Sequence, residues 1–386
     1  MKEWTATTFS EAIDSNPKVY IKQGETVENC EMEDIEPSFK YVYPRDGKVY
    51  KGGNAKFQNG DTVFARITPC LENGKIAQIK GLKQNKAIGS TEFFVFRGLE
   101  GISDNDFVFY LCKTNLVRDT AINSMTGASG RQRADLKAIK KIPLKLPSLS
   151  IQKQIASILS AYDELIEVNN QRIKLLEETA RELYKEWFVR MRFPGFKEAK
   201  FAKGVPEGWV IKKVKEIVER RKFGKTYRPE ELKENGDVVV IDQSTDPILG
   251  YHNNKPDHNA TAENPIIIFG DHSCKMQLMI EPFSLAENVI PFVSHGKNPI
   301  YYLFYLVKSL VETTEYKRHW NELISKSVFV GTPEHQVKYS QLVKPMFEQI
   351  ENLKSQNTQL RQIRDRLLPR LISGKLEVAL KASSEK

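Results

Sequence analysis

The stretch that decides the fold is IQKQIASILSAYDELIEVNNQRIKLLEETARELYKEW, residues 151–187. Apolar residues, or residues that a coiled-coil seam tolerates such as asparagine, recur in it at alternating spacings of four and three. This is the spacing of a coiled-coil seam. Because neither proline nor glycine occurs between residues 151 and 192, the pattern predicts one helix, on the order of 60 Å long at about 1.5 Å per residue. The predicted seam is Ile151, Ile155, Ile158, Tyr162, Leu165, Asn169, Leu176, Ala180, Leu183 and Trp187.

A second stretch near the C-terminus has the same pattern, displaced by 195 residues. It predicts a helix that ends at Gly374, a residue type favoured just after a helix. Two long helices separated by a globular segment could pack as an antiparallel pair, with polar seam residues fixing the register; the alternative is two separate amphipathic surface helices. The second seam is Met346, Ile350, Leu353, Asn357, Leu360, Arg364, Leu367 and Leu371.

The chain also repeats outside the helices. Residues 109–113 read FYLCK and residues 304–308 read FYLVK, again 195 positions apart. Each half opens with a tryptophan, Trp4 and Trp209, and these lie 205 positions apart. A repeat of this length indicates a duplicated domain pair, because solenoid units span only about 20–50 residues.

The globular parts contain strand-rich segments. DTVFARI, KIAQI and TEFFVFR in the first half, and DVVVID and PIIIFG in the second, combine β-branched and aromatic residues between turn signals. We therefore expect an α+β fold, with two tandem mixed α/β domains separated by two long helices that form an antiparallel coiled coil with a pseudo-two-fold repeat. The expected boundaries are a first domain at 1–146, a spacer helix at 147–192, a second domain at 193–336 with a linker at 193–208, a second spacer helix at 337–376 and a tail at 377–386.

Composition limits the function classes. With 58 Lys and Arg against 49 Asp and Glu, the formal net charge is +9, which suits a protein that meets a polyanion but does not identify one. The four cysteines form no CxxC pair, so a reducing cytosol fits better than a disulfide framework. The start MKEWTATTFSEAID lacks a secretion signal and no window approaches the roughly 18 apolar residues of a membrane span, so we expect a cytoplasmic protein.

Motifs for catalysis are weak. Neither GxxxxGK[ST] nor GxGxxG occurs, so the usual phosphate cradles are missing. Asn298-Pro299-Ile300-Tyr301 is similar to the NPPY motif of adenine methyltransferases, but it departs from that motif at Ile300 and no glycine-rich cofactor loop precedes it. The simpler interpretation is a loop that leads into a helix.

Two further clusters have a chemical and a structural interpretation. A metal site could form from Asp271, His272 and Cys274 with His252 and His258, but their spacing fits no standard zinc pattern, and we expect no metal. Glu72 and Lys75 could belong to a nuclease site, but Asn73-Gly74 between them favours a hairpin turn. We therefore expect no catalytic residue.

Several motifs together resemble one known family. They are NGDTVFARITPCLENGKIAQI (59–79), AIGSTEFFVFRG (87–98), SGRQR (129–133), KIPLKLPSLSIQKQIASILSAYDELIE (141–167), LYKEWFVRMRFPG (183–195) and VPEGW (205–209). With these motifs the whole chain resembles the specificity subunit of type I restriction-modification systems. The start of the second spacer, QLVKPMFEQIENLK, departs from the family's proline-leucine entry, so the start of that helix is less well defined.

This resemblance implies a layout and a set of partners. Two target-recognition domains would each read one half of a bipartite DNA site, and the spacer helices would set the unread gap. Two DNA adenine methyltransferase subunits would dock on the chain and use S-adenosylmethionine, and restriction subunits would add ATP- and Mg-dependent translocation and cleavage. The chain itself would bind none of these cofactors.

Candidate DNA-binding residues are those of the types that read base edges or neutralise phosphates, where they cluster in polar loops. The alternative for each is a solvated surface side chain. In the first half they are Lys51, Asn54, Lys56, Arg66, Thr68, Lys75, Ser129, Arg131 and Arg133. In the second half they are Arg221, Lys222, Lys225, Tyr227, Arg228, Gln243, His272 and Lys275.

Two rival functions remain open at this point. One is a non-catalytic coiled-coil scaffold that binds proteins but not DNA, for which the duplicated helices alone would suffice. The other is a self-sufficient DNA-modifying enzyme. Trp187 and Phe188, at the end of the first helix, could anchor a partner or pack on the second globular part.

Overall fold

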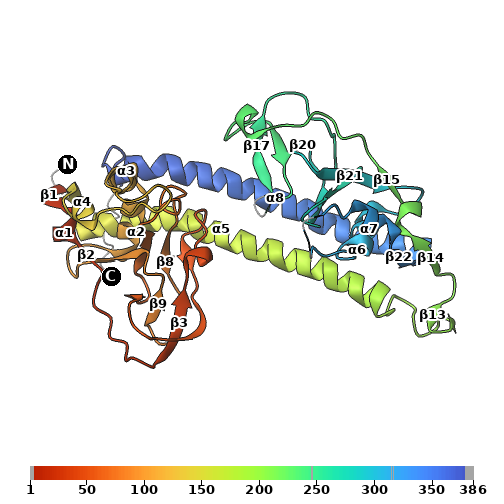
Figure 1. Ribbon diagram of the computed structural model, residues 1–386, viewed down its shortest axis with the longest axis horizontal. Coiled ribbons are helices and arrows are strands. Elements are labelled where there is room, and N and C mark those ends of the chain that lie inside the picture. Colours follow the sequence, from red (N-terminus) through yellow and green to blue (C-terminus); the bar gives the residue numbers. More distant parts are fainter. Residues whose placement is uncertain (1–3, 245–246, 314, 316, 379–386) are drawn as a thin grey trace, which may run out of the picture. The chain divides into compact units, whose positions relative to one another are not determined.

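The computed structural model describes residues 4–244, 247–313, 315 and 317–378 (Figure 1). The chain divides into two compact units. The first unit is formed by Met1–Val168 and Gln356–Lys386, and the second by Asn169–Ser355. Two long helices, α5 (Leu149–Tyr184) and α8 (Pro333–Ile372), each contribute one end to the first unit and the other end to the second.

The first unit is built on antiparallel and mixed sheets. Its strands are β1 (Trp4–Thr8), β2 (Ile13–Ser15), β3 (Thr26–Cys30), β4 (Tyr41–Val42), β5 (Arg45–Val49), β6 (Ala55–Phe57), β7 (Thr62–Ala65), β8 (Ile76–Ile79), β9 (Ala87–Gly89), β10 (Phe93–Gly98) and β11 (Pro143–Pro147). They form sheets with the orders β2-β10-β7-β8-β4, β5-β3-β9-β6 and β1-β11. The shorter helices are α1 (Phe9–Ala12), α2 (Asn105–Lys113), α3 (Asn115–Asn123) and α4 (Leu136–Lys140).

Strand β10, an inner strand of its five-stranded sheet, is buried on both faces. Phe94 and Phe96 lie in a cluster with α2 and the start of α5, whereas Phe93 and Val95 lie in a second cluster with Phe57 of the neighbouring sheet. Because successive side chains of a strand point to opposite faces, a continuous apolar run such as FFVF is what a doubly covered strand requires. The strands expected from DTVFARI, KIAQI and TEFFVFR are confirmed as β7, β8 and β10.

The second unit repeats this strand order. Its strands are β12 (Phe201–Ala202), β13 (Val205–Pro206), β14 (Val210–Lys213), β15 (Val218–Arg220), β16 (Val238–Ile241), β17 (Ile248–His252), β18 (Ile266–Gly270), β19 (Met276–Met279), β20 (Phe283–Leu285), β21 (Val289–Ser294) and β22 (Ser327–Val330). The orders β15-β21-β18-β19, β17-β16-β20 and β14-β22 correspond to the three sheets of the first unit. The parallel strand pair β16 with β20 in the second unit matches β3 with β9 in the first. Helices α6 (Ile300–Val307) and α7 (Trp320–Ser325) take the places of α2 and α4.

The two long helices start at equivalent points of the two repeats. The buried amide of Gln152 donates from Nε2 to Pro147 O at 2.9 Å, and the buried amide of Gln336 donates to Gly331 O at 2.7 Å, each bond reaching back five residues. These glutamines lie 184 positions apart, so the one-for-one match of the seams at 195 is wrong as a structural equivalence. The two offsets, 195 and 184, differ by 11 residues, which is about three helical turns. A shift by whole turns brings the apolar residues back to the same face of the helix, which explains why the seams also match at 195.

The helix ends differ slightly from the expected boundaries. Helix α8 begins at Pro333 rather than at 337, because a proline is well suited to the first helical position, where its missing N–H costs no bond. It ends at Ile372, and Gly374 follows with a φ of 72° and donates its N–H to Leu371 O, as expected for a C-terminal glycine. Helix α5 continues past Tyr184 as one π-helical turn, Lys185–Val189.

The buried face of α5 is also displaced from the predicted seam. Ile158 is 37% exposed and Leu165 is 46% exposed, whereas their neighbours Leu159 and Ile166 are buried. Both seam positions were therefore assigned to the wrong face. The polar positions Asn169, Asn357 and Arg364 are buried, as the pattern predicted.

The aromatic end of α5 packs within the second unit. Trp187 and Phe188 are buried in one cluster with Trp209, Tyr302 and Tyr339. Of the two interpretations open from the sequence, packing against the second globular part is therefore the observed one. None of the described helices combines the length and the hydrophobicity needed to cross a bilayer.

Candidate nucleic-acid interface

Two candidate arginines of the first unit meet at one carboxylate. Glu92 accepts hydrogen bonds from Arg66 Nε at 3.2 Å and from Arg133 Nη2 at 2.6 Å. The guanidinium of Arg133, followed by that of Arg66, lowers the pKa of Glu92 from its ordinary value. Both arginines remain partly exposed, so the carboxylate fixes their positions without removing them from solvent.

Backbone bonds hold two loops together around this cluster. Thr68 N donates to Gln132 O at 3.0 Å, and Ala134 N donates to Arg66 O at 2.8 Å. The first loop joins β7 to β8, and the second precedes α4. Ser129 and Arg131 are exposed on the second loop, beside Gly130, whose φ is 75°. We call this set the first loop cluster; it comprises Arg66, Thr68, Ser129, Arg131 and Arg133.

The other candidates of the first unit are not part of the first loop cluster. The ammonium group of Lys75 donates a hydrogen bond to Met32 O at 2.8 Å. Asn54 donates to Gly89 O at 3.1 Å, and the ammonium of Lys56 lies 4.5 Å from the ring centre of Tyr50. Lys51 is exposed on the same segment. The Asn73-Gly74 pair closes a ten-residue connection between β7 and β8 rather than a tight two-residue hairpin, because Leu71, Asn73 and Lys75 first form helix-like turns.

The second unit also brings three candidates together. His272 N donates to Gln243 Oε1 at 2.9 Å, and Lys275 Nζ donates to Ser244 O at 2.8 Å. His272 and Lys275 lie on the connection between β18 and β19, which corresponds to the connection between β7 and β8. We call Gln243, His272 and Lys275 the second loop cluster.

The basic run 220–228 is only partly available to a ligand. Arg221, Lys222, Lys225 and Arg228 are exposed, but Tyr227 is buried and stacks on His252 with ring centres 4.3 Å apart. The Tyr227 ring therefore belongs to the core, and its assignment to DNA contact was wrong. Burial removes the large apolar surface of the ring from water. Lys225 forms an ion pair with Glu231 at 3.0 Å.

Sequence reasoning missed a basic pair beside the second loop cluster. Lys317 and Arg318 are exposed, and Lys317 O contacts His272 Nδ1 at 3.0 Å. They precede α7 much as Arg131 and Arg133 precede α4. The order of elements could have indicated this pair, because α7 takes the place of α4. The connection from α6 to α7 is shorter than that from α2 to α4, however, so a fixed sequence offset does not align the two basic pairs.

The residues considered above for a metal site and for methyltransferase chemistry make contacts within the fold. Asp271 accepts hydrogen bonds from the backbone N–H groups of His319 and Trp320, at the start of α7. His252 contacts Ser284 and His258 contacts Phe223 O. No group of three or more His, Cys, Asp or Glu side chains in the described part of the chain could hold a metal ion. The NPIY segment leads directly into α6, with Pro299 at its N-cap.

Comparisons with known proteins point to one family. Residues 2–178 match the family model of the type I restriction modification DNA specificity domain. This match covers the first unit's strands and most of α5.

Similar proteins agree with this match. The chain is 24% identical over 303 residues to the type I restriction enzyme MjaIX specificity subunit of Methanocaldococcus jannaschii, covering 71% of this chain and 69% of that protein. It is 29% identical over 170 residues to the EcoAI specificity subunit of Escherichia coli, covering 42% of this chain but only 29% of that protein. The crystal structure of the type I S subunit from M. genitalium has a TM-score of 0.54 at 16% identity, covering 95% of this chain and 96% of that one, which is a likeness of fold.

Proposed function

We propose that the chain is a DNA specificity subunit of a type I restriction-modification system, as the family match of residues 2–178 and the named relatives support, and that each of its two repeats reads one part of a bipartite DNA target. The observation that carries this proposal is the duplication of the site itself. Arg66 and Thr68 of the first loop cluster lie between β7 and β8, and His272 and Lys275 of the second lie on the equivalent connection between β18 and β19. Each cluster combines cationic side chains with polar groups of the types that contact base edges and phosphates.

The long helices support a fixed gap between the two half-sites. Within the first unit, Arg364 of α8 pairs with Asp163 of α5. Within the second unit, Tyr339 of α8 donates to Ala180 O of α5 at 2.9 Å. Position numbers thus rise along α5 while they fall along α8, which is the relation expected of an antiparallel spacer. Such a spacer would convert two modest half-site affinities into one strong affinity through effective concentration.

The helices also offer a surface for the expected protein partners. Within the first unit, apolar side chains of α5 remain exposed at Ile158, Leu165 and Val168. A row of exposed apolar residues at near-heptad spacing on a helix is typical of a docking face for another helix. We assign this face to the two adenine methyltransferase subunits, which would bring S-adenosylmethionine, while restriction subunits would bring ATP and Mg.

The proposal is tested by measuring duplex DNA binding of the chain together with its methyltransferase partner across salt concentrations. A DNA-reading subunit gives a steep, linear fall of log K with log salt, whereas a protein-only scaffold gives no such slope. Incubation of the chain alone with DNA, magnesium and S-adenosylmethionine tests the remaining rival. Any turnover in that incubation would contradict a non-catalytic subunit.

A further inference from the structure

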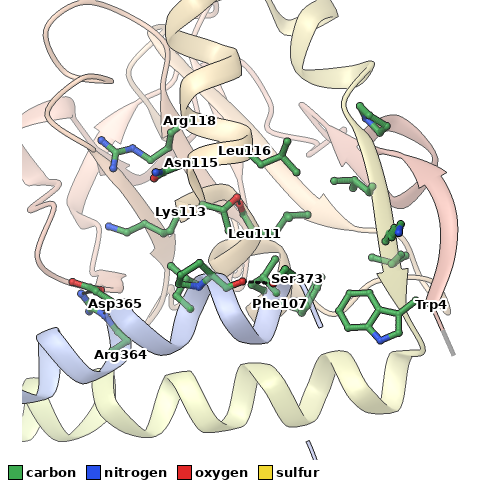
Figure 2. Close-up of a pocket in the computed structure, with 18 of the residues that line it drawn as sticks. Trp4, Phe107, Leu111, Lys113, Asn115, Leu116, Arg118, Arg364, Asp365 and Ser373 are labelled. Atoms are coloured by element: carbon green, nitrogen blue, oxygen red, sulfur yellow. Dashed lines mark hydrogen bonds and ion pairs between the residues drawn. The ribbon is translucent and has the colours of Figure 1, made fainter. Parts of the chain in front are cut away.

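A pocket of about 850 Å³ opens in the first unit beside the C-terminal part of α8. Its apolar wall is formed by β1, α2, β11 and α8, and includes Trp4, Phe107, Leu146, Leu368 and Ile372. Figure 2 shows Trp4 at one end of the pocket, and Lys113, Arg118 and Arg364 toward the other. The loop clusters do not contribute to this lining, so the pocket is a separate feature of the first unit.

The equivalent place in the second unit is filled by aromatic rings. Phe188 lies 4.7 Å from Tyr302 and 5.8 Å from Trp209, measured between ring centres. Tyr184 stacks on Phe188 at 5.3 Å and lies 6.1 Å from Tyr302. These rings are part of one continuous buried cluster or pack directly against it.

The repeat identifies which side chains leave the first unit open. Strand pairing places Leu146 beside Thr5 and Val330 beside Val210, which makes the preceding tryptophans equivalent. The matched glutamines at the helix starts set the equivalence along α5 and α8. The resulting pairs are Trp4 with Trp209, Phe107 with Tyr302, Leu368 with Tyr184 and Ile372 with Phe188. Two aromatic side chains of the second unit are thus replaced by smaller aliphatic ones at the pocket.

The pocket is also lined by cationic side chains. Lys113, Arg118, Arg361 and Arg364 line it against one carboxylate, Asp365. Arg364 is neutralised by Asp163 and Asp365, whereas in the described part of the chain Lys113 donates to Pro37 O and Arg118 to Glu72 O.

Two of these cations, Lys113 and Arg361, form no direct ion pair with a carboxylate among the described residues, although Asp163 and Asp365 lie near enough to act on both. Burial, together with Arg364 and Arg118, lowers the pKa of Lys113 to about 8. The buried Nε atom of Arg361 has no hydrogen-bond partner among the described residues. Lys113 and Arg361 are only partly exposed. A partly buried cation without a directly paired carboxylate destabilises its site, and an incoming anion would relieve this cost.

We propose that this pocket is a docking site for a protein segment that carries an aromatic side chain next to carboxylates. The aromatic side chain would occupy the space that Tyr184 and Phe188 fill in the second unit. The carboxylates would meet Lys113, Arg118 and Arg361. The apolar wall favours a peptide over a nucleic-acid strand, because a phosphodiester offers no aromatic side chain without unstacking a base. The inference does not rest on DNA recognition, since no residue of the loop clusters takes part.

The test uses the full chain and a fluorescein-labelled peptide with one tryptophan followed by three glutamates, and a twin in which lysines replace the glutamates. Fluorescence anisotropy should give saturable binding for the acidic peptide and binding weaker by about tenfold or more for its lysine twin. Leu368→Trp fills the pocket, and Arg361→Glu reverses its charge; each should weaken binding by about tenfold. Arg366→Glu, exposed on the same helix outside the pocket, is the matched control and should leave binding within about twofold.

Four results would overturn the proposal. One is the absence of acidic-peptide binding up to about 1 mM, the weak end of specific affinities. A second is equal loss of binding in Arg366→Glu and Arg361→Glu. A third is displacement of the peptide by a short single-stranded oligonucleotide at equimolar concentration, which would assign the pocket to nucleic acid. The last is a dimer in sedimentation velocity that Leu368→Trp converts to a monomer, which would assign the pocket to a second copy. Circular dichroism and unchanged DNA binding of both variants separate this outcome from misfolding and from failure of the proposed function.

Discussion

Glu92 determines how the first loop cluster presents its charge. Its carboxylate holds the guanidiniums of Arg66 and Arg133, which come from loops far apart in the sequence. An arginine fixed in this way loses less conformational entropy when it contacts a base or a phosphate. The pair is therefore arranged before any ligand binds.

This arrangement predicts the effect of Arg133→Ala. Loss of a positioned base or phosphate contact should weaken binding to the cognate DNA by about 1–3 kcal/mol, and more than it weakens binding to an unrelated duplex. Arg45→Ala is the matched control, because Arg45 is exposed and paired with Asp34 outside the loop clusters. Anisotropy titrations at one salt concentration measure both, and equal losses for the two variants would argue against a reading role.

Lys113 predicts a pH dependence of stability. Its folded-state pKa of about 8 lies below its ordinary value of 10.5, chiefly because of burial and then because of Arg364 and Arg118. Between these values the unfolded chain binds more protons, so the free energy of unfolding should rise from about pH 8 to pH 10.5, and the penalty is fully present below pH 8.

Lys113→Met removes this titration. Urea denaturation of both proteins at several pH values in this window should show the variant's advantage shrinking as the pH rises. A difference that stays constant with pH would contradict the shifted pKa.

At the scale of elements, the buried contact between α5 and α8 in the first unit is an ion pair. Arg364 and Asp163 have side chains that are 11% and 3% exposed, and Tyr110 also donates to Asp163. Such a pair contributes little net stability, but removing one member leaves a buried charge.

We predict that a single substitution in this pair lowers the free energy of unfolding much more than the double substitution does. Arg364→Met should lower the free energy of unfolding by about 3–5 kcal/mol, because Asp163 then stays charged and unpaired. Adding Asp163→Asn should recover most of this loss, since the amide still accepts the bond from Tyr110 without a charge. Urea denaturation of the three variants measures the coupling, and additive losses would contradict it.

The elements were largely predictable, but their registers were not. The apolar runs predicted β7, β8, β10, β16 and β18, and the uninterrupted stripes predicted both long helices. The exposed positions Ile158 and Leu165 show where a stripe misleads, because a four-three pattern is compatible with two adjacent helix faces. Only the bond from each buried glutamine to Pro147, the last residue of β11, or to Gly331, just after β22, fixed which residues of α5 and α8 are equivalent.

For the whole molecule, the proposed spacer predicts a change in the recognised DNA. Inserting four residues after Leu175 adds about one helical turn of 5.4 Å, which should lengthen the unread gap by one or two base pairs at about 3.4 Å per step. Single-base methylation mapping in a host that carries the complete system reports both half-sites and their gap. An unchanged gap would argue against a rigid spacer.

The sequence by itself determined the duplication, the two long helices and the main strands, because periodicity and repeated motifs are local properties of the chain. Tertiary structure alone decided that Tyr227 is core, that Arg66 and Arg133 share Glu92, and that Lys317 and Arg318 lie beside His272. It also decided that the first unit keeps a pocket where the second is filled. These outcomes depend on contacts between segments tens to hundreds of residues apart. Because the loops of the two repeats differ in length, no fixed sequence spacing predicts which residues make these contacts.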